Sequence, residues 1–179
     1  MTGTKRKTHS TIIFLSHLPS PVGELHIATV GDTVYYIAFE TPAYHEHMYA
    51  FFTRHFREYE VRPENGEHAK IHEQLRKYFQ GRLQRFTVKT HLLGTDFQLQ
   101  VLTALRSIPF GATKSYKAVA AMIGNPDSMR AVGGAVGRNP IPIIVPCHRV
   151  IGEDGGLVGF GGGIERKKKL LALEGALLV

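Results

Sequence analysis

The sequence contains a single cysteine, Cys147. One cysteine cannot form an internal disulfide or supply a structural zinc site built from several cysteines. It fits a reducing compartment, so we expect the cytoplasm, or the nucleus if the source is eukaryotic. No apolar run approaches the roughly 20 residues that cross a bilayer, and the polar N-terminus lacks the apolar stretch of a secretory signal. We therefore expect no membrane association.

Acidic residues are scarce in one segment. Between Gln98 and Gly152 the chain has six basic residues and one acidic residue, Asp127, which gives a net charge of +5 in a chain whose total is +7. The only cysteine lies in this segment. In the N-terminal half the signs alternate, as is typical of a solvated surface. The basic segment indicates a polyanionic partner, but charge alone does not identify it.

The length and composition predict a globular protein of one or two domains. The chain has 179 residues, of which 43% are hydrophobic and 21% are charged. Residue types and spacing in the first half predict α+β structure, with strands over 11–17, 22–30, 33–41 and 86–88 and helices over 44–56 and 67–79. We expect a linker at 91–94, which divides the chain into domains at residues 1–92 and 93–179.

The second half has a mainly helical pattern. Thr95 and Gln98 form a capping-box pattern at the start of an apolar helical stripe. Ser115 can cap a short helix over 116–123, and Asn125 can cap a second helix that runs to about 136. Two short helices around a tight turn predict a helix-turn-helix unit. Glycine-rich loops precede a final helix over 164–173.

The second helix of this pair has an unusual face. It carries Ala131, Gly133, Gly134 and Ala135, where a helix that reads bases would carry long polar side chains. Each glycine inside a helix costs roughly 1 kcal/mol relative to alanine. Close packing against another helix explains such residues about as well as close approach to a nucleic-acid backbone. Arg130 is the one long side chain on this face. It either forms an ion pair on the surface or enters the base stack.

The cysteine lies in a proline-rich apolar segment, residues 140–150, whose three prolines argue against a central strand. We expect a rigid, extended and buried segment. A lone cysteine is most often a small buried apolar residue. The adjacent His148 is only suggestive. The rigid prolines, the nearby cations Arg149 and Arg130 and the polar Asn139 instead favour a positioned, activated thiol. Glu174 is a distant carboxylate that could orient His148.

These motifs resemble those of one family. Asn139-Pro140 followed by Pro146-Cys147-His148-Arg149-Val150 is similar to the active-site signature of the O6-alkylguanine-DNA alkyltransferases, which repair DNA by direct reversal. The resemblance covers nearly the whole C-terminal half in the same order and spacing. It implies a ribonuclease-H-like N-terminal domain and a C-terminal domain with a winged helix-turn-helix motif. It also implies irreversible, single-turnover transfer of an alkyl group from O6 of guanine, or O4 of thymine, with base flipping and no cofactor.

The resemblance implies a role for each matching residue. Cys147 is the alkyl acceptor, His148 and Glu174 form a proton relay through a water, and Asn139 holds the active-site turn. Tyr116 donates a proton toward the departing guanine, and Arg130 fills the gap left by the flipped base. The implied contacts with double-stranded DNA, in the minor groove and without sequence preference, are made by Arg130, Ala131, Gly133, Ala135, Tyr116 and Ser115. The implied alkyl pocket consists of Pro142, Val150, Phe160, Gly161 and Gly162.

The sequence departs from the family pattern at a few positions. Leu102 replaces a common tryptophan and Phe160 a common tyrosine, and we interpret both as packing. Gly161 replaces a serine, which removes a hydroxyl from the pocket. The cysteine-containing zinc set of some members is missing, and we expect His68 and His72 to be surface residues and not metal ligands. We expect a monomer.

Three other functions compete with alkyl transfer. A non-catalytic lesion-binding protein of the alkyltransferase-like kind would lack the acceptor, so Cys147 argues against it. A helix-turn-helix transcription regulator would need base-reading side chains, which residues 131–135 do not supply. A cysteine–histidine hydrolase would need an oxyanion hole, of which the sequence gives no sign.

Overall fold

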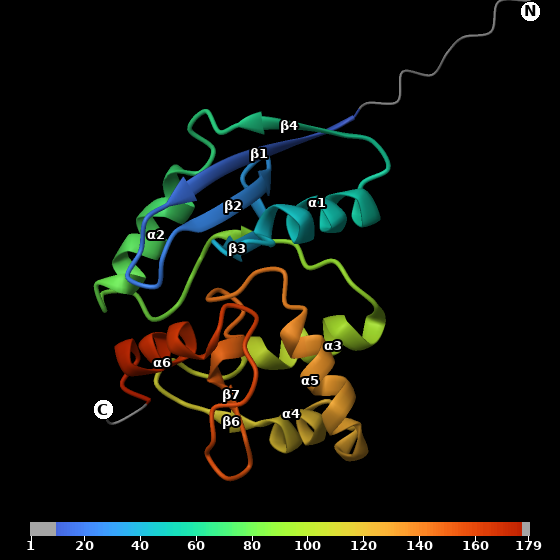
Figure 1. The fold of residues 1–179 in the computed structure, drawn as a ribbon, viewed down its shortest axis with the longest axis vertical. Helices are drawn as coiled ribbons and strands as arrows, with labels where there is room; N and C mark the ends of the chain where they lie inside the picture. Colours follow the sequence, from blue (N-terminus) through green and yellow to red (C-terminus); the bar gives the residue numbers. More distant parts are fainter. Residues whose placement is uncertain (1–9, 177–179) are drawn as a thin grey trace, which may run out of the picture.

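A five-stranded mixed sheet forms the upper part of the molecule in Figure 1, a computed structural model that describes residues 10–176. The strands lie in the order β4-β1-β2-β3-β5. The antiparallel meander β1, β2 and β3 is flanked by β4, parallel to β1, and β5, parallel to β3. Their bounds are Thr11–Leu18, Leu25–Val30, Thr33–Phe39, Tyr59–Pro63 and Lys89–Thr90.

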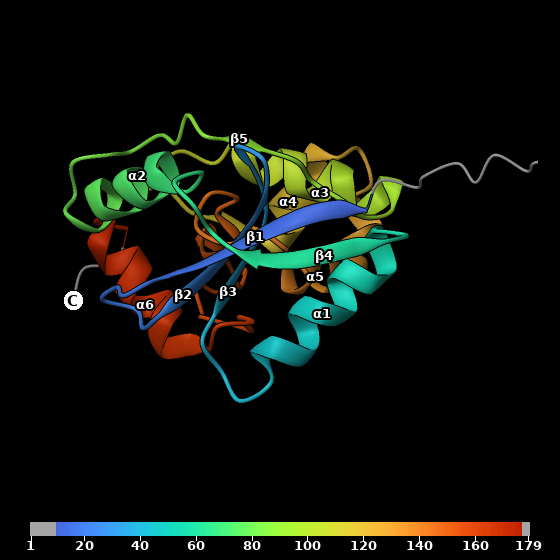
Figure 2. The ribbon, with the colours of Figure 1, turned by 90° about the horizontal axis from the view of Figure 1, so that it is seen from above.

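Two helices pack on opposite faces of this sheet, as the view from above shows (Figure 2). Helix α1, Tyr44–His55, buries Met48 and Phe52 against Ile13 and Ala28. Helix α2, Ala69–Phe79, places its apolar stripe in the main core on the other face. The alternation of side chains along a strand separates the two clusters, since Ala28 and its neighbour Ile27 point to opposite faces.

The second half lies below the sheet in Figure 1 and is mainly helical. The capping box predicted at Thr95 and Gln98 is confirmed at the start of α3, and Ser115 caps α4 by accepting a bond from the Ala118 amide. Leu102 is buried in the core. The elements are α3 Asp96–Arg106, β6 Lys114–Ser115, α4 Tyr116–Met122, η1 Pro126–Ser128, α5 Met129–Gly137, η2 Cys147–Arg149, β7 Val150–Ile151 and α6 Ile164–Leu173.

Several local predictions are wrong. The strand expected over 86–88 forms at Lys89–Thr90 instead, and β4 was not predicted. Asn125 makes no side-chain cap, and its helix starts as a 3-10 turn before α5. Residues 147–149 form the 3-10 helix η2 and are not extended. His68 is fully buried, where its Nε2 bonds the Thr29 hydroxyl at 2.8 Å and its Nδ1 bonds Ser16, so it is no surface residue.

One apolar core connects the two halves. It joins sheet residues such as Leu25 and Ile37 to Tyr78 of α2 and to Leu105 and Leu170 of the second half. The domain boundary at 92–93 therefore crosses a continuous core, and it stays a prediction. No helix between residues 10 and 176 is long and apolar enough to span a membrane. The basic run Lys5–Lys7 lies outside the described residues.

Candidate active site

A strained turn presents Cys147. The Asn139 side chain bridges this turn, donating to the Val145 carbonyl at 2.8 Å and accepting from the Ile141 amide at 3.0 Å. Ile143 has a φ of 74°, a conformation that a β-branched residue rarely adopts. Such strain persists only where the surroundings impose it, as at functional sites. The turn leads into η2, the single helical turn that Cys147, His148 and Arg149 form, and all three residues are buried.

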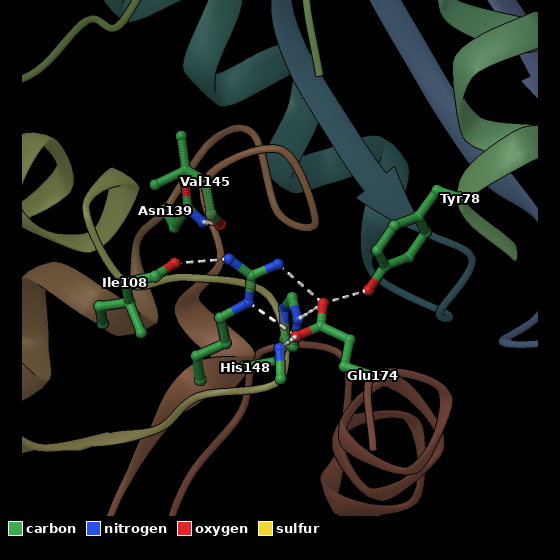
Figure 3. A network of polar contacts seen from close by, with 8 residues as sticks. Tyr78, Ile108, Asn139, Val145, His148 and Glu174 are labelled. Atoms are coloured by element: carbon green, nitrogen blue, oxygen red, sulfur yellow. Dashed lines mark hydrogen bonds and ion pairs between the residues drawn. The ribbon is translucent and has the colours of Figure 1, made fainter. Parts of the chain in front are cut away.

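A buried network surrounds Glu174 at the end of α6 (Figure 3). Its Oε1 lies 2.8 Å from His148 Nε2 and 2.9 Å from an Arg149 terminal nitrogen, and its Oε2 lies 2.7 Å from Arg149 Nε. Arg149 also donates to the Ile108 carbonyl at 2.6 Å. The hydroxyl of Tyr78, on α2, donates to the same Oε1 at 2.7 Å. The structure thus joins the predicted pair His148 and Glu174 and adds Arg149 and Tyr78.

The charges in this network determine the protonation state of His148. Burial alone would raise the pKa of Glu174, but hydrogen bonds from His148 and Arg149 outweigh it and lower that pKa to about 2. Burial lowers the pKa of His148, although its bond to Glu174 opposes the shift. An ionised Glu174 only accepts hydrogen bonds, so the neutral His148 carries its proton on Nε2. Nδ1 is then a free base, and it is buried without a hydrogen-bond partner among residues 10–176.

Cys147 is buried beside this base. Burial raises the pKa of the thiol to about 11, and hydrogen bonding by Asn139 and the charge of Lys167 only partly oppose the shift. The expectation of a thiol already activated by nearby cations is therefore wrong for the free protein. Arg149 is engaged by Glu174, and Arg130 is exposed on α5. The thiol stays protonated at neutral pH until a base removes its proton.

Lys167 is a buried cation that the sequence analysis missed. It is fully buried on α6, and its Nζ donates to the Val150 carbonyl at 2.6 Å and to the Val158 carbonyl at 3.0 Å. These bonds tie the strand after Cys147 to the glycine-rich loop. The sequence feature that could have revealed this burial is helical spacing, which places Lys167 on the same face of α6 as Leu170, Leu171 and Glu174.

A cavity of about 130 Å³ opens at Cys147. Four predicted pocket residues line it, namely Pro142, Phe160, Gly161 and Gly162, together with Asn139. Val150 does not line it. Val150 is fully buried in β7 and pairs with Lys114, so the prediction of a pocket role for its side chain is wrong. The opposite wall comes from the N-terminal half and was not predicted: Tyr36, Ile37, Ala38, Phe39, Thr41, Tyr44 and His47.

Gly162 is the point where the two walls meet. A Cβ there would lie 2.6 Å from the Phe39 ring and 2.8 Å from the Phe160 ring, closer than packed atoms allow. Arg166 holds the same junction, donating to the Val22, Gly162 and Glu40 carbonyls at 2.7, 2.8 and 2.9 Å. Any side chain at Gly162 would displace Phe39, so a substitution at Gly162 cannot report cleanly on the width of the pocket.

The predicted DNA face on α5 is only partly exposed. Arg130 and Ala131 are exposed and Gly133 is half-buried, but Ala135 is 1% exposed in the core. The prediction that the Ala135 side chain faces a partner is therefore wrong. The packing explanation of the small residues holds for the side of α5 that packs inward with Val132 and Ala135. For the exposed side, close approach to a nucleic acid stays a prediction.

Tyr116 lies against the exposed side of α5. A Cβ on Gly133 would lie 3.9 Å from its ring, and its hydroxyl donates to the Val158 carbonyl at 3.2 Å. Burial raises the pKa of this phenol, so it remains a proton donor. Tyr116, Arg130, Gly133 and Val158 line a second hollow of about 360 Å³ that does not include Cys147. Ser115 caps α4, and its DNA contact stays a prediction.

Comparison with known proteins identifies the family. The family model described as 6-O-methylguanine DNA methyltransferase, DNA binding domain, matches residues 96–176. The methylated-DNA–protein-cysteine methyltransferase of Mycobacterium leprae is 42% identical over 163 residues, 91% of this chain and 93% of the relative. The crystal structure of Mycobacterium tuberculosis OGT in complex with DNA gives a TM-score of 0.77 at 42% identity over 92% of each chain. The O6-methylguanine-DNA methyltransferase of Pyrococcus kodakaraensis gives 0.68 at 29% identity, covering 91% of this chain and 99% of its own. The chain belongs to the methylated-DNA–protein-cysteine methyltransferase family.

Proposed function

We propose that this protein repairs alkylated DNA by moving an alkyl group from O6 of guanine to Sγ of Cys147. The thiol proton passes through a water to Nδ1 of His148. Sγ then attacks the alkyl carbon, so that an S–C bond forms while the C–O6 bond breaks and its electron pair leaves with guanine. Tyr116 supplies a proton to the departing base and regains one from solvent. The product is a thioether, a poor leaving group, so each molecule reacts once.

One observation carries this proposal. Within the part of the chain that the structure describes, the buried Nδ1 of His148 has no partner, while Nε2 is held by an ionised Glu174 that Arg149 neutralises. A base of this kind, one residue from a buried thiol at a small cavity, supports proton removal at the moment of attack. Burial keeps the thiol protonated until then, which protects it from other electrophiles.

We also propose that α5 binds the minor groove of double-stranded DNA without sequence preference. Its exposed surface has small residues and lacks the amide and carboxylate side chains that read base edges. Reaction at O6 requires the target base to leave the stack, and Arg130 is placed to fill the gap. The hollow lined by Tyr116 and Arg130 supports a site on this face where the target base leaves the stack.

The same proposal includes the folds of the two domains, the oligomeric state and the cellular compartment. The mixed sheet with helices on both faces supports a ribonuclease-H-like N-terminal domain, residues 1–92. The pair α4 and α5 beside the two-stranded sheet of β6 and β7 supports a winged helix-turn-helix in residues 93–179. We expect a monomer, and the single free cysteine favours the cytoplasm.

Mass spectrometry of the intact protein tests the function directly. After mixing with duplex DNA that carries one O6-methylguanine, we expect a gain of about 14 Da on Cys147, since one methyl replaces one hydrogen. Cys147→Ser is the matched control. It should gain no mass but still bind the duplex, because a hydroxyl is a far weaker nucleophile.

The other outcomes of this experiment identify the competing functions. Binding of the lesion by wild-type protein without any gain in mass would indicate a lesion-binding protein. Preference for one unmodified sequence would indicate a regulator. A transient acyl adduct that turns over would indicate a hydrolase.

A further inference from the structure

Tyr78 brings the N-terminal half into the active-site network. It lies on α2, is fully buried, and is separated from Glu174 by 96 positions in the sequence. Its hydroxyl donates to Oε1 of Glu174 at 2.7 Å, and Figure 3 shows it reaching the carboxylate from the side opposite Ile108. A ring that only filled the core would not need this hydroxyl.

We propose that Tyr78 is a positioning residue for the transfer reaction: its hydroxyl fixes Oε1 of Glu174 and withdraws part of that oxygen's charge from His148. The inference rests on the function proposed above, because it acts on the same proton relay. It assigns to the N-terminal half a part in the chemistry of Cys147.

The crowding at Oε1 supports this role. This one oxygen accepts from Tyr78 at 2.7 Å, from His148 at 2.8 Å and from Arg149 at 2.9 Å. Three donors share its charge, so the bond to His148 is weaker than it would be with two. The other oxygen takes Arg149 Nε and the Gly111 amide. Tyr78 can be changed without removing either the charge of Arg149 or the base at His148.

The groups that contact Glu174 come from three parts of the chain: Tyr78 from α2, His148 and Arg149 from η2, and the Gly111 amide from the loop after α3. Lys167, on α6, donates to main-chain carbonyls, and its charge opposes protonation of His148. Burial raises the pKa of Tyr78, and the charge of Glu174 raises it further, so its hydroxyl remains a donor throughout the working pH range. Tyr78 therefore keeps its charge state there, and His148 is the group whose protonation responds.

Removal of the hydroxyl should make His148 more basic. In Tyr78→Phe the freed charge on Oε1 stabilises the imidazolium form, so His148 should be protonated at a higher pH than in the wild type. Protonated His148 cannot accept the thiol proton. The acid limb of alkyl transfer should therefore move to higher pH by the same amount.

The test follows the His148 imidazole by NMR during titration and the rate of reaction with free O6-benzylguanine against pH. We expect both midpoints to rise in Tyr78→Phe. The matched control is Tyr59→Phe, which removes a hydroxyl bonded to Thr53 in the other core cluster and should leave both midpoints unchanged. Fluorotyrosine incorporation makes the phenol a stronger donor, so it should lower the midpoints in the wild type but not in Tyr78→Phe.

Opposite shifts from a weaker and a stronger donor cannot arise from loosened packing. Unchanged midpoints in Tyr78→Phe, or equal shifts from fluorotyrosine with and without Tyr78, would overturn the inference. The NMR titration needs no alkyl transfer. A wild type that fails to react would therefore refute the proposed function, while the titration would still decide the role of Tyr78.

Discussion

At the scale of single residues, Glu174 links the chemistry of the site to its stability. Its carboxylate neutralises Arg149 and holds His148, and all three side chains are almost completely buried. Removing one partner of a buried ion pair leaves the other charge without compensation, which typically costs about 3–5 kcal/mol. The same change removes the group that holds the proton on Nε2 of His148.

We predict that Glu174→Gln destabilises the fold at neutral pH by an amount of that order and slows alkyl transfer. The pKa of Glu174 falls from its ordinary value of 4.5 to about 2 on folding, so its contribution is complete above pH 4.5 and is lost as pH falls toward 2. Urea unfolding at a series of pH values checks this. The difference between wild type and variant should shrink below pH 4.5, and a constant difference would contradict the assignment.

The sequence allowed some of these residues to be predicted and concealed others. Cys147, His148 and Glu174 were predicted because a rare residue, its neighbour and a matching motif pointed to them. By its spacing, Tyr78 belongs to the apolar stripe of its helix, and its hydroxyl has a partner 96 positions away, so no local pattern could indicate its role. Lys167 was concealed in the basic run Arg166–Lys169, where only helical spacing separates the buried residue from the exposed ones.

At the scale of elements, α5 divides into two faces with different roles. Val132, Ala135 and Val136 are buried in the core, and Arg130 and Ala131 are exposed at its beginning. A short helix whose exposed side chains are this small can approach DNA closely. Arg130 is then the side chain that extends furthest from the helix. In the proposed function, it stabilises an extruded base.

We predict that Arg130→Ala slows repair of duplex DNA on the order of tenfold or more while reaction with free O6-benzylguanine is nearly unchanged. Extrusion of a base costs a few kcal/mol, and a free base needs none. Single-turnover rates on both substrates provide the measurement. Arg138→Ala, which removes the same charge at the other end of α5, is the control. Equal losses on the two substrates would make Arg130 a structural residue.

Elements with strong local signals were predicted well. The final helix, 164–173, has the predicted bounds, and the capping box and the Ser115 cap start their helices as expected. The two-residue strand β5 and the polar strand β4 carry little pattern, because their partners in the sheet determine their structure. The turn at Cys147 depends on Asn139 and on the positive φ of Ile143, which tertiary contacts impose.

At the scale of the whole molecule, the reactive cavity belongs to both halves of the chain. Cys147, Pro142 and Gly161 form one wall, and Phe39 and Tyr44 contribute to the other. The main-chain bond from the Ile37 amide to the Pro140 carbonyl, 2.8 Å, holds these walls together. The size of the alkyl group that fits is therefore determined by the packing of the two halves, and the active-site motif alone could not predict it.

We predict that O6-benzylguanine reacts with Cys147. The cavity measures about 130 Å³, close to the ~150 Å³ of an engineered apolar cavity that binds benzene, and Pro142 offers a flat apolar wall. Gly161 is the position that tests its width, since a Cβ there would find only the Gly137 carbonyl, at an ordinary 3.6 Å. Gly161→Trp should therefore block benzyl transfer far more than methyl transfer, and Gly161→Ala should affect neither. The assay preincubates each protein with the benzyl compound and then adds methylated DNA. Wild-type methyl transfer that survives preincubation undiminished would mean that the benzyl group does not reach Cys147.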